Sequence, residues 1–433
     1  MRWGVLVGVL LLLGIAQPNF AKPPNVILII SDDQAWTDYS FMGHSHIQTP
    51  NIDQLAKDSL TFTRGYVPSS LCRPSLATMI TGLYPHQHKI VGNDPAVVDG
   101  VPGRNNPQYN QRREHLISHI DAVGTLPKWL AEIGFVSHQS GKWWEGNFSR
   151  GGFSAGMTRG FPQPGGRHGD DGLTIGRQGL EPVTKFMDQA VAEDKPFFVW
   201  YAPFLPHTPH NPPERLLQKY QDKIDSLPIA KYWAMCEWFD ETVGQLLDHV
   251  DKQGIAEETL VLYVTDNGWI NLPNESAYAP RSKRSPNEGG IRTPVMVRWP
   301  KTVQPKMDSQ TLVSSIDLAP TILTACGMAV PADLPGRNLL DPEALKDRDT
   351  LYGEILEHDV VDVDDPAKSL KYRWVIQGNW KLIQPDLLAD SNQVELYDLA
   401  NDPHENSNLA NINPDRVAEL QANLNAWWSP NKE

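Results

Sequence analysis

The chain has 433 residues and a mass of 48.5 kDa, which suits one large domain with a smaller one, or two to three domains. Apolar residues make up 40% and charged residues 21%, which excludes a wholly disordered chain. The formal net charge of −14 excludes a general nucleic-acid or anionic-membrane binder, since both need a basic surface. An anionic substrate would therefore need local basic residues and a bound metal. Three cysteines are too few for a disulfide framework.

The first 21 residues have the pattern of a secretory signal peptide. Arg2 supplies a positive charge, an apolar run covers residues 4–15, and Ala16 and Ala21 are both possible cleavage points. The run is shorter than the roughly 20 residues that span a bilayer. No cysteine lies near the cleavage region, and no second long apolar run follows. We therefore expect an exported protein, periplasmic or extracellular, without a membrane anchor.

Continuous apolar runs indicate buried strands at residues 25–30, 196–201 and 259–265. Helical patterns lie between and beside them, at residues 49–56, 123–133 and 230–250. Buried strands that alternate with helices predict an α/β domain around a large, mixed and mostly parallel central sheet. The long, polar, Gly-rich stretches 92–113 and 146–179 are typical of loops that face a substrate.

The chain changes character after Pro335-Gly336. Short strand-like pieces follow at residues 371–376, 380–383 and 394–399, and a helical stretch covers residues 414–427. These elements predict a small α+β unit with an antiparallel sheet. We therefore divide the chain into a signal peptide (1–21), a main domain (22–340) and a C-terminal α+β subdomain (341–433).

Polar side chains follow two of the predicted buried strands directly. Asp32 and Asp33 come after the first strand, and Asp266 and Asn267 come after the third. In parallel sheets ligands bind beyond the carboxyl ends of the strands, so we expect these four residues to meet in space.

Several motifs in fixed order resemble those of the formylglycine-dependent (type I) sulfatases, which are arylsulfatase-like members of the alkaline phosphatase superfamily. The opening strand with its paired aspartates is one, and Leu71-Cys-Arg-Pro-Ser-Leu-Ala-Thr-Met-Ile-Thr-Gly82 resembles the family signature. The others are Gly141-Lys-Trp143, Pro206-His-Thr-Pro209, Thr265-Asp-Asn-Gly268, Lys283 with Glu288-Gly-Gly-Ile-Arg-Thr-Pro294, and Gly378-Asn-Trp-Lys-Leu-Ile383 with Glu395-Leu-Tyr-Asp-Leu399.

This resemblance implies an alkaline-phosphatase-like α/β sandwich, with residues 22–340 as the catalytic domain, that hydrolyses a sulfate ester. It implies that a maturation enzyme oxidises Cys72 to formylglycine, whose hydrate attacks sulfur. Lys142 and Lys283 would neutralise the charge of the transferring group. His207 would bond a sulfate oxygen or protonate the leaving oxygen.

The resemblance also implies a metal site made of hard oxygen ligands. Asp32, Asp33, Asp266 and the Asn267 carbonyl suit Ca²⁺, and Mg²⁺ less well. Residue 72, once modified, would complete the ligand set. The metal would polarise a sulfate oxygen and favour the deprotonated nucleophile.

Two positions depart from the family pattern. Leu76 stands where the signature has an arginine that the maturation enzyme reads, so conversion of Cys72 is expected to be incomplete if that enzyme needs the arginine. Trp144 stands where a histidine accompanies the family's lysine. His168 in a Gly-rich loop is the first candidate to replace that histidine. The other candidates are His44, His86 and His88.

The 14 tryptophans and the long loops suit stacking on sugar rings, so we expect a sulfated carbohydrate or another sulfated small molecule as substrate. Two alternatives remain open at this point. If Cys72 stays a thiol, the scaffold could support a metal-dependent phosphoryl-transfer hydrolase. If turnover has been lost, the protein would be a non-catalytic binder of sulfated glycans.

Overall fold

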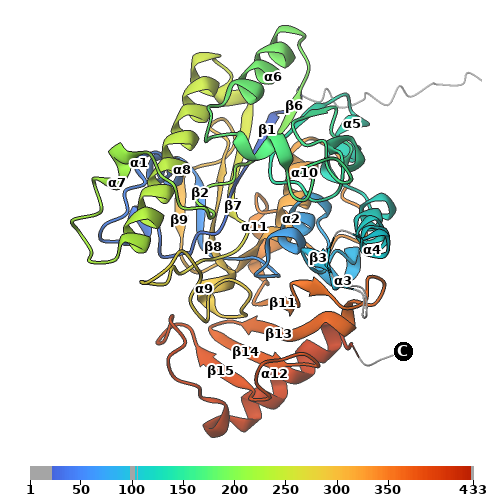
Figure 1. Cartoon of the computed structure of the whole chain (residues 1–433), viewed down its shortest axis with the longest axis vertical. Coiled ribbons are helices and arrows are strands. Elements are labelled where there is room, and N and C mark those ends of the chain that lie inside the picture. Colours follow the sequence, from blue (N-terminus) through green and yellow to red (C-terminus); the bar gives the residue numbers. More distant parts are fainter. Residues whose placement is uncertain (1–21, 98–102, 105, 431–433) are drawn as a thin grey trace, which may run out of the picture.

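The computed structural model describes residues 22–97, 103–104 and 106–430 (Figure 1). The predicted signal peptide, residues 1–21, lies outside the described residues. Within those residues, no helix combines the length and the apolar character needed to cross a membrane.

The described part of the chain is built around a nine-stranded mixed sheet with the order β10-β2-β8-β7-β1-β6-β4-β5, in which β9 also pairs with β2. Strand β8 runs antiparallel to β2 and β7, and the other pairings are parallel. The strands are β1 (Asn25–Ser31), β2 (Leu60–Tyr66), β4 (Val136–Gly141), β5 (Ala155–Gly156), β6 (Phe197–Ala202), β7 (Thr259–Thr265), β8 (Arg292–Arg298), β9 (Lys306–Asp308) and β10 (Val313–Ser314). This sheet confirms the predicted mixed, mostly parallel architecture.

Both faces of the sheet are buried, as the continuous apolar runs predicted. In β1, Val26, Leu28 and Ile30 pack into one apolar cluster, and Ile27 and Ile29 pack into the other. Helices α2 (Cys72–Thr81), α5 (Leu126–Ala131) and α10 (Leu318–Ala325) cover the first face. Helices α1 (Pro50–Lys57), α6 (Glu181–Ala192) and α8 (Leu227–Lys252) cover the second. The three predicted strands and three predicted helices are thus present, with ends shifted by a few residues.

The prediction of one loop over residues 92–113 is wrong in its second half. Helix α4 (Pro107–Ser118) begins there, and the Asn106 side chain accepts a hydrogen bond from the Tyr109 amide at 2.8 Å. An asparagine before a proline is an ordinary helix start, and the polar composition of the segment concealed it. Four short α-helices are α3 (Pro85–His88), α7 (Glu214–Leu217), α9 (Glu288–Ile291) and α11 (Pro342–Lys346).

The C-terminal part forms the predicted antiparallel sheet, in the order β11-β13-β14-β15 (Figure 1). Its strands are β11 (Thr350–Leu356), β13 (Leu370–Gln377), β14 (Trp380–Pro385) and β15 (Glu395–Asp398), and helix α12 (Pro414–Trp427) lies across them. Leu420 and Leu424 of α12 pack against Val375, Leu382 and Leu396 of the sheet. A separate two-stranded pair joins β3 (Asp94–Pro95) to β12 (Asp359–Val360). The division at residue 340 stays a prediction.

A buried ionic cluster connects the C-terminal sheet to the main domain. Lys381 on β14 is fully buried, and its ammonium lies 3.0 Å from a carboxylate oxygen of Glu288 and 2.8 Å from one of Glu405. The other Glu405 oxygen accepts the Glu288 amide at 2.8 Å. Because both carboxylates are also buried, Lys381 supplies a countercharge that solvent cannot replace.

Replacing Lys381 with methionine should therefore destabilise the fold strongly. Removing one partner from a buried ionic cluster costs about 3–5 kcal/mol, because the remaining charges lose compensation. Arg292, 3.6 Å from Glu288, and Arg281, 3.8 Å from Glu405, would replace Lys381 only in part. Lys368→Met is the control, since the Lys368 side chain is 54% exposed and pairs only with surface carboxylates. Urea unfolding followed by tryptophan fluorescence measures both. Equal stability of the two variants would contradict this role for Lys381.

Candidate active site

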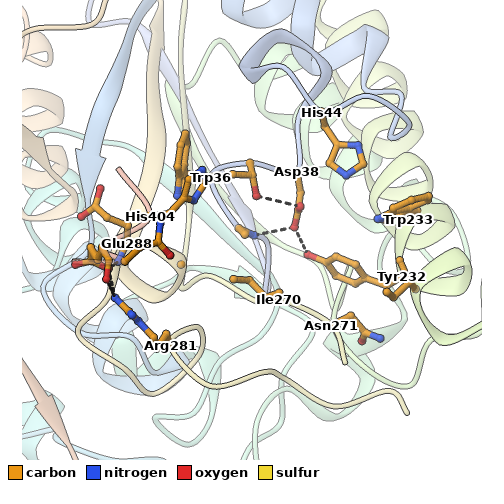
Figure 2. Close-up of a pocket in the computed structure, with 16 residues that line it drawn as sticks. Trp36, Asp38, His44, Tyr232, Trp233, Ile270, Asn271, Arg281, Glu288 and His404 are labelled. Atoms are coloured by element: carbon orange, nitrogen blue, oxygen red, sulfur yellow. Dashed lines mark hydrogen bonds and ion pairs between the residues drawn. The ribbon is translucent and has the colours of Figure 1, made fainter. Parts of the chain in front are cut away.

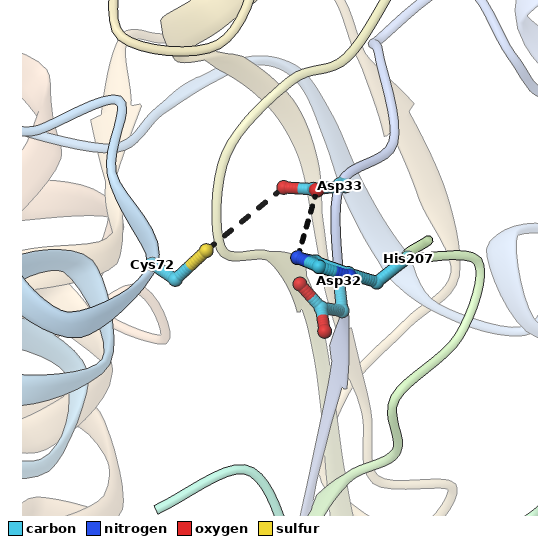
Figure 3. Close-up of side chains that lie close together, drawn as sticks. All are labelled: Asp32, Asp33, Cys72 and His207. Atoms are coloured by element: carbon cyan, nitrogen blue, oxygen red, sulfur yellow. Dashed lines mark hydrogen bonds and ion pairs between the residues drawn. The ribbon is translucent and has the colours of Figure 1, made fainter. Parts of the chain in front are cut away.

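The carboxyl ends of β1 and β7 bring together the four residues predicted to meet there. The Asp33 amide donates to an Asp266 carboxylate oxygen at 3.0 Å, and the Asn267 side-chain amide donates to Asp33 at 2.7 Å. Asp33 has a φ of +67°, the left-handed region, which turns the chain sharply after the strand. Figure 3 shows the paired aspartates between Cys72 and His207. The parallel pairing of β1 with β7 places these polar groups side by side.

Two buried lysines face these carboxylates from different elements. Lys142 follows β4 and donates to Asp32 at 2.7 Å. Lys283 precedes α9 and donates to both oxygens of Asp33, at 2.6 and 2.8 Å. Burial lowers the pKa of each ammonium, but the carboxylates outweigh it and raise both pKa values above the ordinary range. Both lysines are therefore charged at neutral pH.

Gly141 shows how closely Lys142 is positioned. Its φ is +83°, and a Cβ at this position would lie 1.7 Å from the Ala202 carbonyl oxygen. Only glycine fits where β4 ends against β6, and the lysine that follows is thereby directed toward Asp32.

Cys72 is the first residue of α2 and is 1% exposed. Its sulfur lies 3.1 Å from the Lys283 ammonium and 4.0 Å from an Asp33 carboxylate oxygen. Burial raises the pKa of the thiol to about 12, although Lys142 and Lys283 act in the opposite direction. The predicted nucleophile position therefore lies against both a lysine and a carboxylate of the same cluster.

Two of the predicted histidines line the same cavity. His207 places Nε2 3.3 Å from Asp33, and its Nδ1 donates to the Thr208 carbonyl at 2.6 Å. His168 packs against the Trp144 ring, with the ring centroids 5.1 Å apart. Burial lowers the pKa of His168 to about 3, helped by the charge of Lys142, and places the pKa of His207 well below its ordinary value. His168 therefore lies beside Trp144, and its role as the substitute histidine stays a prediction.

The three other candidate histidines lie elsewhere. His44 lines a neighbouring cavity together with Asp38 and Tyr232 (Figure 2). His86 pairs with Glu354, and His88 is buried against Thr78. None of the three is among the residues that line the cavity of Cys72, so the structure assigns them no place in this site.

Oxygen atoms without a hydrogen-bond donor gather where the metal was predicted. Among the described residues, Asp32 Oδ2, Asp266 Oδ2 and Asn267 Oδ1 are buried and have no partner. Burial raises the pKa of Asp32 and Asp266, which Lys142 only partly opposes. The Lys142 ammonium lies 3.9 Å from Asp266 Oδ2, beyond hydrogen-bond distance. Asp32 and Asp33 offer carboxylate oxygens within 4.8 Å of each other and of ligand atoms of Cys72 and His207, and such hard oxygen ligands fit a divalent cation.

Leu76, in the place of the signature arginine, is a core residue. Its side chain is 4% exposed and packs in the apolar cluster on the α2 face of the sheet. The neighbouring Arg73 is also fully buried and pairs with both carboxylate oxygens of Glu145, at 2.8 and 2.6 Å. It also donates to the Asn93 carbonyl. Arg73 therefore connects the helix that carries Cys72 to the segment that carries Lys142.

The cavity in front of Cys72 has a volume of about 390 Å³. Sequence reasoning identified Cys72, Lys142, His168, His207 and Lys283 on its wall. It did not assign the remaining polar and aromatic wall residues, which include Asn93, Arg167, Trp269, Tyr278, Arg284 and His358. Asn93 and Arg167 lie in the two stretches predicted to face a substrate, residues 92–113 and 146–179, but only the fold shows that the other four line the same cavity.

Comparison with known families agrees with this geometry. The family described as Sulfatase matches residues 24–328, and the family described as N-sulphoglucosamine sulphohydrolase, C-terminal, matches residues 279–429. The first match covers more than half of the chain. The chain therefore belongs to the sulfatase family, and its activity is the hydrolysis of a sulfate ester.

Individual relatives support the same conclusion. Arylsulfatase A from Bos taurus is 30% identical over 453 residues, covering 90% of this chain and 84% of the relative. N-acetylgalactosamine-6-sulfatase from Canis lupus familiaris is 27% identical over 386 residues, covering 78% and 69%. The crystal structure of Ps i-CgsB in complex with k-i-k-neocarrahexaose has a TM-score of 0.74 at 24% identity, covering 95% of this chain and 94% of that chain. The predicted alkaline-phosphatase-like fold is confirmed.

The Arg73–Glu145 pair allows a test of how the segments that carry Cys72 and Lys142 are held together. Arg73→Met should lower the free energy of unfolding by about 3–5 kcal/mol, because Glu145 stays buried without a partner. The double variant Arg73→Met/Glu145→Met should recover most of that loss, since two apolar side chains replace the pair. Thermal and urea unfolding measure both variants. Additive losses in the double variant would show that the pair is not coupled.

Proposed function

We propose that this sulfatase hydrolyses a sulfate ester of a carbohydrate, using formylglycine made from Cys72 and one Ca²⁺ ion. The observation that carries the proposal is the set of unpartnered oxygens of Asp32, Asp266 and Asn267 beside the Cys72 sulfur and the two buried lysines. Asp33 would complete the oxygen ligands, and residue 72 in its modified form would be a further ligand of the cation. Formylglycine, when present, supplies a hydrated aldehyde that acts as the nucleophile.

The charges of the cluster support a divalent cation. Three carboxylates against two ammonium groups leave one net negative charge, which repels a sulfate ester. A divalent cation changes this to one net positive charge, which matches the single negative charge of the ester. Oxygen ligands alone favour Ca²⁺ over softer metals, and Mg²⁺ remains the second choice.

Side chains of the protein would bind the sulfate group and transfer the proton. Lys142 and Lys283 would bind the equatorial oxygens of the transferring group, where negative charge gathers in the transition state. His207 lies beside Asp33 and would bond a sulfate oxygen or protonate the leaving oxygen. His168 faces the same cavity and would take the part of the histidine that Trp144 replaces.

Maturation of Cys72 would require an enzyme that accepts leucine at position 76. Leu76 is part of the core, so an arginine there would bury a charge without a partner. Such an enzyme could not bind the Cys72 segment in the folded protein, because α2 is buried along its whole length. Conversion would therefore act on the chain before it folds, in an exported protein whose residues 1–21 are a signal peptide.

A carbohydrate is the substrate that the cavity wall supports. Trp269 and Tyr278 line it with aromatic rings, and Arg167 and Arg284 add positive charge beside them. Rings for stacking and cations for sulfate groups suit a sulfated sugar. Among the relatives, one is named for N-acetylgalactosamine 6-sulfate and one structure contains a neocarrahexaose.

Metal and nucleophile can be tested on one purified preparation. Intact-mass analysis of the Cys72 peptide should show loss of the thiol sulfur with gain of oxygen in at least part of the molecules. Exhaustive chelation should abolish hydrolysis of an aryl sulfate, and added Ca²⁺ should restore it. Asp33→Ala and Asp266→Ala should be nearly inactive. Full activity in metal-free protein, or activity with an unmodified Cys72 throughout, would overturn the assignment.

The two lysines provide a further prediction. Lys142→Met and Lys283→Met should each reduce kcat/KM for an aryl sulfate by about 10²-fold, comparable to the loss of one oxyanion-hole donor. Lys185→Met is the control, since Lys185 lies on the surface of α6 and pairs with Glu181. Steady-state kinetics at saturating Ca²⁺ measures the three variants. Wild-type rates in both active-site variants would place the anion-binding groups elsewhere.

A further inference from the structure

A second cavity, of about 270 Å³, lies next to the active-site cavity. Helix α4 contributes Tyr109 and Arg113 to its wall, and the Gly-rich segment 161–167 closes the other side. Arg167 lines both cavities. A ligand in the active-site cavity would therefore lie close to the second cavity, because the Arg167 side chain forms part of both walls.

Positive charge dominates this second cavity. Arg104, Arg113 and Arg167 all pair with the single carboxylate of Asp94, which is fully buried at the base. The Arg113 guanidinium lies 3.1 Å from Asp94, and that of Arg104 lies 3.4 Å away. Arg104 also contacts the half-exposed Asp359 at 2.6 Å. Three guanidinium groups exceed the two carboxylates, in a chain whose net charge is strongly negative.

Two buried donors on the wall have no acceptor. Among the described residues, the Tyr109 hydroxyl and the Arg113 Nε have no hydrogen-bond partner. Solvent cannot readily serve as one, because Tyr109 is only 1% exposed and Arg113 only 6% exposed. A buried donor without an acceptor is costly, and both of these line the same cavity. An anion in the cavity would accept from both and would meet the excess positive charge.

The chain connects the two cavities at three places. Asn93 and His358 line the active-site cavity, and their successors Asp94 and Asp359 pair with the arginines of the second one. Arg167 stacks over the Trp144 ring at 4.8 Å and reaches Asp94 from there. The second cavity therefore borders the active-site cavity and shares Arg167 with it.

We propose that this cavity binds a second anionic substituent of the substrate, so that the enzyme prefers saccharides with a further sulfate or carboxylate beside the ester it cleaves. Arg104, Arg113 and Arg167 bind this anion by charge-assisted hydrogen bonds, and the Tyr109 hydroxyl donates to it. The inference rests on the proposed carbohydrate substrate and assigns its class more narrowly.

Equilibrium binding to the Cys72→Ala variant tests the inference without requiring turnover. The probes are disaccharides with one sulfate and no other charged group, the same disaccharides with two sulfates, and disaccharides with one sulfate and one uronic acid. We expect the doubly charged probes to bind at least tenfold more tightly, and the two doubly charged arms to show whether sulfate or carboxylate is preferred. Equal affinity of singly and doubly charged probes would overturn the inference, while failure of wild-type protein to hydrolyse any sulfate ester would instead overturn the proposed function.

Substitutions locate the effect. Tyr109→Phe removes an unpartnered hydroxyl, so its thermal midpoint should be at least that of wild type, while the preference for doubly charged probes falls about fivefold. Arg104→Gln should lower the same preference about tenfold. Arg159→Gln is the matched control, because Arg159 is 54% exposed, pairs with Asp170 and Asp171, and lines neither cavity. An unchanged preference in both Tyr109→Phe and Arg104→Gln, or an equal fall in Arg159→Gln, would contradict a specific site.

Discussion

The concentration of buried carboxylates at the ends of β1 and β7 is the constraint on which the rest of the site depends. Asp32, Asp33 and Asp266 are withdrawn from solvent within one hydrogen-bonded cluster, and such a group is tolerated only when positive charge meets it. Lys142 and Lys283 come from separate elements to supply that charge. Charge compensation therefore determines which segments of the chain must meet at this site.

Charge is distributed very unevenly in this protein. The chain as a whole is acidic, yet arginine and lysine side chains surround the cavities where an anionic ligand would lie. Negative charge elsewhere keeps other polyanions away, and the local cations attract only ligands that fit between them. Arg73 has a structural role instead. Its bidentate pairing with Glu145 fixes the position of α2, so its guanidinium is not available to a ligand.

The sequence allowed prediction of the features that depend on local pattern. Apolar runs identified the central strands, and the polar residues directly after two of them identified the carboxylate cluster, because the carboxyl ends of neighbouring parallel strands lie side by side. Pairings between distant segments were not predictable in this way. Nothing near Arg73 indicates Glu145 as its partner, and nothing near Asp94 indicates three arginines. Leu76 was first noted as a loss of charge, whereas the structure shows an apolar core position that a leucine fills.

The ionic cluster around Lys381 affects how this fold can be recombined. The lysine belongs to the C-terminal sheet, whereas Glu288 belongs to the segment that follows Lys283 in the main domain. A chimera that takes its C-terminal sheet from one sulfatase and its main domain from another must keep this match of charges across the junction. A crossover placed before residue 281 would keep Glu288, Lys381 and Glu405 in one segment, and the junction would then have to match the Lys283–Asp33 pair instead.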